Sequence, residues 1–119
     1  METPSLEYFD TIFGARGPEF WELVDALVAE LHSYAEDLGP LVASRDRAGL
    51  ARLRHSHRPL VENLGLKELA AIEQTLRRAL DDELPEARLA ELLGEFQFHS
   101  RVAAQVLGDT RAGARGNPS

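Results

Sequence analysis

Apolar residues recur every three or four positions along most of the chain, which is the spacing of one face of an α-helix. The clearest run lies between residues 18 and 41, and its apolar members are Phe20, Leu23, Val24, Leu27, Leu31, Tyr34, Leu38 and Leu41. Pro18 suits the first turn of such a helix, whereas Gly39 and Pro40 interrupt the run late. The pattern predicts a long helix that either kinks at Pro40 or stops there before one more turn.

The same spacing predicts four further helices. A short one, capped by Ser5, ends in the glycine-containing segment 14–17, and another runs from a cap at Ser44 or Asp46 to about Asn63, where Gly65 closes it. Two leucine-rich segments follow, and Pro85 opens the second of them. Their expected core positions are Leu66, Leu69, Ile72, Leu76, Leu80, Leu89, Leu92, Leu93, Phe96, Ala103 and Leu107.

Four long helices with short connections predict an all-α fold. The expected architecture is an antiparallel up-down four-helix bundle, with the short extra N-terminal helix packed on one end. Residues 1–107 form the predicted domain. From Gly108 onward the chain is rich in Gly, Arg, Asn and Ser, so residues 108–119 are predicted to be a disordered tail.

Composition narrows the range of functions. The 119 residues include no cysteine, which excludes disulfides and thiolate chemistry, and the formal net charge of −7 argues against nucleic acid or an anionic membrane as partner. No apolar run is long enough for a membrane span. Glu2 and Glu7 stand where a signal peptide would be basic, so we expect a cytoplasmic protein. No nucleotide, cofactor or metal motif is visible.

Two histidines of the third predicted helix fall on different faces. At about 100° per residue, six positions lie within about 100° of one another and form the core stripe. They are Leu50, Leu53, His57, Leu60, Val61 and Leu64. His55 falls opposite this stripe, so one histidine is predicted to face inward and the other outward. An exposed imidazole beside Arg52, Arg54 and Arg58 is suited to accept a phosphoryl group.

This stretch resembles the histidine phosphotransfer (HPt) domains of phosphorelays, whose motif is His-x-Leu-Lys-Gly-Ser-x-x-x-Leu-Gly on a helix of a four-helix bundle. The phospho-accepting position falls on His55, the lysine position on Arg58, and the closing pair on Leu64 and Gly65. Asp46 stands nine residues upstream, where the family often has an acidic residue. Ile72 and Glu73 fit a downstream aliphatic–Glu pair. The resemblance covers about residues 5 to 107.

The resemblance implies a phosphotransfer intermediate rather than a turnover enzyme. A nitrogen of His55 would accept a phosphoryl group from an aspartyl phosphate on a response-regulator receiver domain and pass it to a second receiver aspartate. Arg58 would offset the phosphoryl charge. The implied partners are receiver domains or a hybrid histidine kinase. The domain would bind no cofactor, and Mg²⁺ would belong to the receiver.

Two residues depart from the family motif. Pro59 occupies the glycine position, fills the space that a partner would use, and is expected to kink the helix beside His55. His57 occupies the leucine position, where a buried imidazole needs a hydrogen-bond partner; a bent helix would instead expose it as an alternative acceptor. The alternative reading is therefore an adaptor that binds a receiver or kinase without phosphotransfer.

The remaining candidates have simpler interpretations. His55 and His57 point to different sides of a helix, so they make a poor metal pair. His32 and His99 are read as incidental. Phe98 points away from the core of its helix, which suggests a partner or dimer contact. We expect a monomer, with a helical dimer through Phe98 as a third, purely structural reading.

Overall fold

The computed structural model describes residues 2–115, and all regular secondary structure in this range is helical. The helices are α1 (Glu7–Phe13), α2 (Pro18–Ala43), α3 (Arg47–Asn63), α4 (Lys67–Asp81) and α5 (Glu86–Arg115). The prediction of an all-α chain is confirmed. Among the described helices, none combines the length and the apolar character that crossing a membrane requires.

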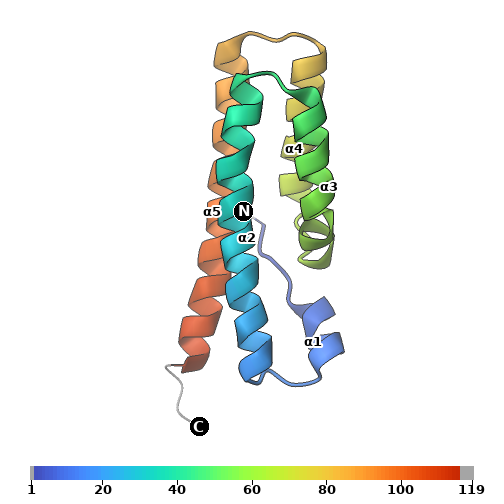
Figure 1. Cartoon of the computed structure of the whole chain (residues 1–119). Coiled ribbons are helices and arrows are strands. Elements are labelled where there is room, and N and C mark those ends of the chain that lie inside the picture. Colours follow the sequence, from blue (N-terminus) through green and yellow to red (C-terminus); the bar gives the residue numbers. More distant parts are fainter. Residues whose placement is uncertain (1, 116–119) are drawn as a thin grey trace.

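The helices α2 to α5 run alternately up and down in Figure 1. The two longest, α2 and α5, lie side by side and form the most extensive helix pair. α3 packs against α2 and α4, and α4 packs against α3 and α5. Because α3 and α4 are shorter, they cover the upper half of the α2–α5 pair in this view, and α1 lies beside the lower half (Figure 1).

The end of α3 is built by local hydrogen bonds that the sequence predicts. After the helix, the amide of Gly65 donates to the carbonyl of Glu62, and the amide of Leu66 donates to that of Val61, at 3.1 and 3.0 Å. Gly65 has φ of +66°, which glycine adopts without a steric penalty. This is the Schellman arrangement expected of a helix closed by glycine.

Two other helices end in the same way without glycine. The residue after the C-cap is Arg45 for α2 and Glu83 for α4, and both have positive φ, at 53° and 54°. Asp46 N donates to Leu41 O, and Leu84 N donates to Ala79 O, which completes the same motif. The Arg45 and Arg47 guanidinium groups donate to the carbonyls of Leu84 and Leu80, so the α2–α3 connection also caps the end of α4.

The interruption at Gly39 and Pro40 does not end α2. The helix continues through both residues to Ala43, so the alternative in which it stops there is wrong. Pro40 is exposed and lacks the amide that would bond to the carbonyl of Glu36. Glu36 is also exposed, which leaves its carbonyl on the solvent side of the helix.

The N-terminal helix also differs in detail. Leu6, not Ser5, is the N-cap of α1, although the Ser5 hydroxyl accepts a hydrogen bond from the amide of Glu7 at 3.3 Å. Phe9 is buried, whereas Ile12 is exposed. Phe13 packs edge-on against Phe20 of α2, which joins α1 to the lower end of the core.

The predicted tail is wrong for residues 108–115, because α5 extends to Arg115. Ala104 and Leu107 are buried in the two turns before Arg111, and the guanidinium of Arg111 lies 2.9 Å from the carboxylate of Asp25 on α2. These contacts anchor the last turns of α5 to α2, which a composition-based prediction could not anticipate. The final four residues of the predicted tail, 116–119, lie outside the described range.

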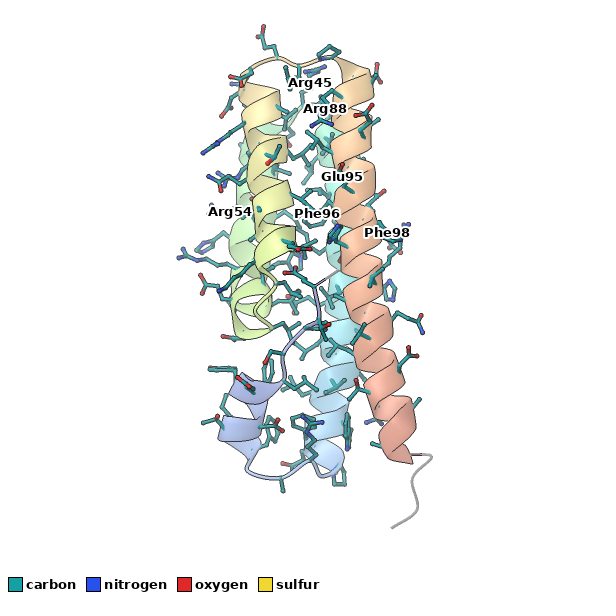
Figure 2. All side chains as sticks on the ribbon, turned by 180° about the vertical axis from the view of Figure 1, so that it is seen from behind. Arg45, Arg54, Arg88, Glu95, Phe96 and Phe98 are labelled. Carbon is teal, nitrogen blue, oxygen red and sulfur yellow. The ribbon has the colours of Figure 1, made fainter. Side chains whose placement is uncertain are left out.

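The core is continuous along α2 and α5 and is extended by leucines of α3 and α4. Its largest fully buried side chains include Tyr34, Phe20 and Phe96. Ser100 of α5 is also fully buried, and its hydroxyl donates to the carbonyl of Leu31 at 2.7 Å, so this polar group is satisfied. Figure 2 shows Phe96 directed between α4 and α5 and Phe98 directed away from the helices.

The two phenylalanines of α5 provide a matched test of the core. Phe96→Ala removes a ring with no exposed surface, so we expect it to lower the free energy of unfolding by about 3–5 kcal/mol. Phe98→Ala removes a ring that is 54% exposed and should change that free energy by less than about 0.5 kcal/mol. Urea unfolding followed by circular dichroism measures both. Equal losses would show that α5 is rotated from the orientation described.

Candidate functional site

The candidate phosphoacceptor His55 lies on the exposed face of α3, as predicted. The helix begins where the sequence indicates, because the Asp46 carboxylate accepts a hydrogen bond from the amide of Gly49 at 2.8 Å. A Cβ at position 49 would lie 2.6 Å from Cδ2 of Leu41, so glycine lets the start of α3 pack closely against the end of α2. Ala51, one turn before His55, is also exposed and has a small side chain.

His57 faces inward, also as predicted. Its Nδ1 lies 2.8 Å from the Glu30 carboxylate of α2, and its side chain is 13% exposed. The imidazole stacks on the ring of Tyr34, with the centroids 4.3 Å apart. The hydrogen-bond partner that the sequence required but could not identify is therefore Glu30. With one nitrogen engaged and one face covered, His57 is poorly placed as an alternative phosphoryl acceptor.

Arg58 lies on the same exposed side of α3 as His55, about 60° away around the helix. Its Nε donates to the carboxylate of Glu62, one turn further along, at 2.8 Å, and this hydrogen bond raises the pKa of the guanidinium. Both side chains are more than half exposed, and such surface pairs contribute little to stability. The guanidinium is therefore free to leave Glu62 for a stronger anion.

Pro59 does not interrupt α3, which continues to Asn63. Proline has no amide proton, so the carbonyl of His55 receives no hydrogen bond from residue 59. His55 is exposed, so water has access to this carbonyl. The pyrrolidine ring is itself exposed one turn after His55 and takes up surface that a glycine would leave open.

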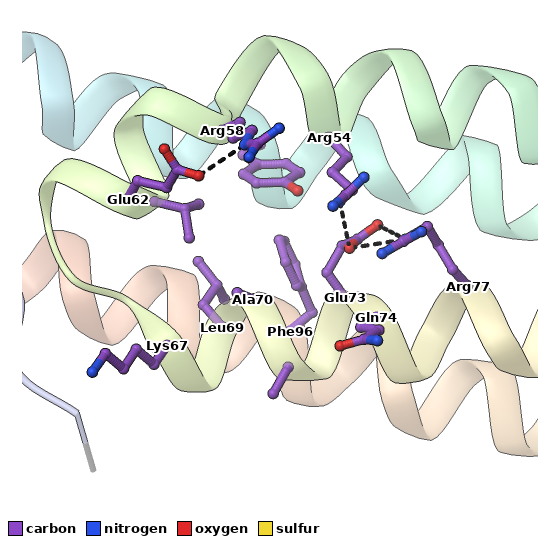
Figure 3. A pocket seen from close by; sticks show the side chains of 13 residues that line it. Arg54, Arg58, Glu62, Lys67, Leu69, Ala70, Glu73, Gln74, Arg77 and Phe96 are labelled. Carbon is purple, nitrogen blue, oxygen red and sulfur yellow. Dashed lines mark hydrogen bonds and ion pairs between the residues drawn. The ribbon is translucent and has the colours of Figure 1, made fainter.

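A groove between α3 and α4 lies beside this face, with a volume of about 430 Å³ (Figure 3). We call it the α3–α4 groove. Arg54 and Arg58 of α3 and Lys67 and Arg77 of α4 contribute its cationic side chains. Tyr34 and Phe96 also line it, which brings the core close to the solvent at this point. Arg54 and Arg58 thus flank His55 in sequence and border the groove in space.

Glu73 is a buried carboxylate at the groove, with its side chain 4% exposed. Nε of Arg77 donates to its Oε2 at 3.1 Å and lies 2.8 Å from its Oε1, and the Nε of Arg54 lies 3.4 Å from Oε2 (Figure 3). Burial raises the pKa of Glu73 and outweighs the opposing effect of the two arginines. Two cations on one carboxylate leave an excess of positive charge here.

Sequence reasoning did not assemble this cluster. The family pattern predicts a position for Glu73, but it does not predict Arg54 and Arg77 as partners of this carboxylate. Two signals were available. Glu73 sits within the apolar stripe of α4, between Leu69 and Leu76, and Arg77 follows it at the i,i+4 spacing of a helical ion pair.

The other histidines stay outside this site. His32 is exposed on α2, and Nδ1 of His99 lies 3.7 Å from the Glu68 carboxylate. Within residues 2–115, no three His, Asp or Glu side chains are arranged to hold a metal ion.

Comparisons with known proteins add no assignment to this geometry. Neither protein-family models, nor curated proteins, nor solved structures gave a match to the chain.

The pKa of Glu73 gives a test of the buried cluster. Because the carboxyl has a higher pKa folded than unfolded, the folded state binds its proton more tightly. The stabilising contribution of Glu73 is thus largest below about pH 4 and declines as the pH rises through the raised folded pKa. We expect an NMR titration of the Glu73 side-chain carboxyl to give a value above 4.5.

Asp10 serves as the internal control in the same titration. Its exposed carboxylate accepts two hydrogen bonds from Arg16, which hold its pKa below the ordinary value of 3.8. The two carboxyls should therefore move in opposite directions. A depressed value at Glu73 would mean that the arginines, not burial, dominate its environment.

Proposed function

We propose that the chain is an HPt-like phosphorelay protein built on an antiparallel up-down four-helix bundle, with His55 as the residue that carries the phosphoryl group. The observation that carries the proposal is the orientation of α3, which exposes His55 and turns His57 inward. A relay histidine must be reachable by the active site of another protein. The cytoplasm, where receiver domains and hybrid kinases act, is its expected location.

The proposed reaction needs little from the domain beyond presentation of the imidazole. The lone pair of a neutral His55 nitrogen attacks the phosphorus of a receiver aspartyl phosphate. An N–P bond forms, the bond between phosphorus and the carboxyl oxygen breaks, and the aspartate leaves as a carboxylate. The imidazole releases the proton of its other nitrogen to solvent. Transfer to a second receiver aspartate reverses these steps.

Arg58 is proposed to stabilise the phosphorylated state. A phosphoryl group on His55 is a stronger acceptor than the Glu62 carboxylate and lies about one turn from Arg58. The guanidinium would then exchange its exposed pair with Glu62 for one with the phosphoryl oxygens. The negative charge of Glu62 would repel the phosphoryl group, and this repulsion would favour transfer of the group to the next receiver.

Pro59 supports the alternative function. Its exposed ring stands one turn from His55, on the surface that an approaching receiver would have to cover. In this alternative the domain is a degenerate adaptor that binds a receiver or a kinase and does not exchange phosphoryl groups. The exposed Phe98 is compatible with the third reading, a structural helical dimer.

The relay function is tested by incubating the protein with a phosphorylated cognate receiver. We expect acid-labile label on the native protein and none on His55→Gln. His32→Gln and His57→Gln are matched controls that remove an exposed and an inward imidazole, and both should keep the label. Retained label in His55→Gln would falsify the assignment of the acceptor.

The role of Pro59 is tested by Pro59→Gly and Pro59→Ala in the same assay. Both substitutions restore the amide that bonds to the His55 carbonyl, but only glycine also removes the side chain. We expect faster labelling of Pro59→Gly than of the native protein and an intermediate rate for Pro59→Ala. If the native protein takes no label and Pro59→Gly does, the adaptor is the correct function.

A further inference from the structure

We propose that the α3–α4 groove is a binding site for a small aromatic anion, a molecule with one flat apolar ring and one carboxylate or phosphate group. The site is independent of phosphoryl transfer at His55, since it needs neither that imidazole nor a receiver. Three properties of the groove lead to this ligand class: its size and apolar floor, its charge, and an unused hydroxyl group.

The groove has the size and floor of a small-molecule site. Its volume of about 430 Å³ falls in the range of ligand pockets and accommodates a single ring with a short polar substituent. Tyr34 and Phe96 contact each other edge-on, with centroids 4.8 Å apart, and line the groove together with Leu69. Because the two rings and Leu69 are almost wholly buried, the apolar surface that a flat ligand would cover is that of the exposed Ala70 and Ala71 and the half-buried Val61.

The charge at the groove selects an anion. Its lining has four cationic side chains, Arg54, Arg58, Lys67 and Arg77, and two carboxylates, Glu62 and Glu73. This is a positive region on a chain whose net charge is −7. Lys67 has no ion-pair partner among the described residues, and Arg54 and Arg77 share one carboxylate between them. A ligand carboxylate or phosphate would complete these pairs.

The hydroxyl of Tyr34 supplies a third, directional interaction. The residue is 2% exposed and lines the groove. Its hydroxyl takes part in none of the side-chain hydrogen bonds among the described residues, and it is not one of the fully buried polar atoms left without a partner. The oxygen therefore keeps contact with the solvent in the groove. The Tyr34 hydroxyl is therefore available as a donor to an anionic oxygen. A purely apolar ligand would leave both this donor and the cations unsatisfied.

The binding test uses the full chain labelled with ¹⁵N and four probes. Benzoate and phenyl phosphate combine a ring with a carboxylate or a phosphate. Benzyl alcohol has the ring without the charge, and inorganic phosphate has the charge without the ring. We expect saturable shifts of the amides of Ala70, Ala71 and Gln74 with one or both aromatic anions, and none at Ile12, which lies on the remote helix α1. Whichever of benzoate and phenyl phosphate binds more tightly shows whether the site prefers a carboxylate or a phosphate.

Two pairs of variants locate the site. Lys67→Gln should weaken binding by about fivefold, whereas Arg78→Gln, which removes the same charge from α4 outside the groove, should leave it unchanged. Ala71→Leu narrows the groove and should abolish the shifts, whereas Ala87→Leu on the exposed face of α5 should not. Tyr34→Phe removes only the hydroxyl and should weaken binding. Circular dichroism confirms that each variant is folded.

The proposal is overturned if neither aromatic anion gives saturable shifts, or if benzyl alcohol binds as well as benzoate. It is also overturned if Lys67→Gln and Ala71→Leu bind like the native chain. These measurements use the unphosphorylated chain, so failure here leaves the proposed relay function standing, and failure of the relay leaves this site standing.

Discussion

One aromatic contact supports the rotation of α3 about its own axis, together with Leu50, Leu60 and Leu64, which are buried on the same side. Tyr34 of α2 stacks on the imidazole of His57 and meets Phe96 of α5 edge-on, so side chains of three helices meet in one aromatic cluster. Glu30 holds the same imidazole from the side through a 2.8 Å contact. Residues two apart on a helix differ by about 200°, so fixing His57 inward fixes His55 outward. The accessibility of the proposed phosphoacceptor is thus a consequence of packing two residues away.

The contact between α3 and α4 depends on a charged group, the buried carboxylate of Glu73. Taking this charge out of water is costly, and the attraction of Arg54 and Arg77 offsets that cost only when all three groups stay together. The three side chains are long and polar, and they occupy the space between the helices where apolar residues would interdigitate. A groove lined by both cations and aromatic rings results. A buried ion cluster of this kind is weak evidence for stability but fixes which faces of the two helices meet.

The features predicted from sequence are those with local causes. The helical period, the Asp46 cap, the Gly65 closure and the opposed directions of His55 and His57 each depend on residues within a few positions of one another. The features missed depend on distant residues. Glu30 partners His57 across 27 positions, and Asp25 anchors the turn that contains Arg111, which composition assigned to a disordered tail. Arg45 and Glu83 adopt a glycine-like conformation because the helix-ending hydrogen bonds outweigh the steric cost. Neither arginine nor glutamate is a residue type from which a positive φ would be predicted.

Charge connects the His55 face with the α3–α4 groove. α3 contains four arginines and one glutamate, whereas the chain as a whole is acidic, so this helix forms a positive strip on a negative molecule. Such a strip attracts anions over about a Debye length, roughly 8 Å at physiological ionic strength. The local contacts then separate two kinds of anion. A phosphoryl group carried by a protein would, in the proposed function, meet the imidazole on the exposed face of α3. The proposed small aromatic anion would instead enter the groove, where apolar contact and charge occur together. Arg54 and Arg58 are close to His55 in sequence and also line the α3–α4 groove, so the same two guanidinium groups contribute positive charge to both.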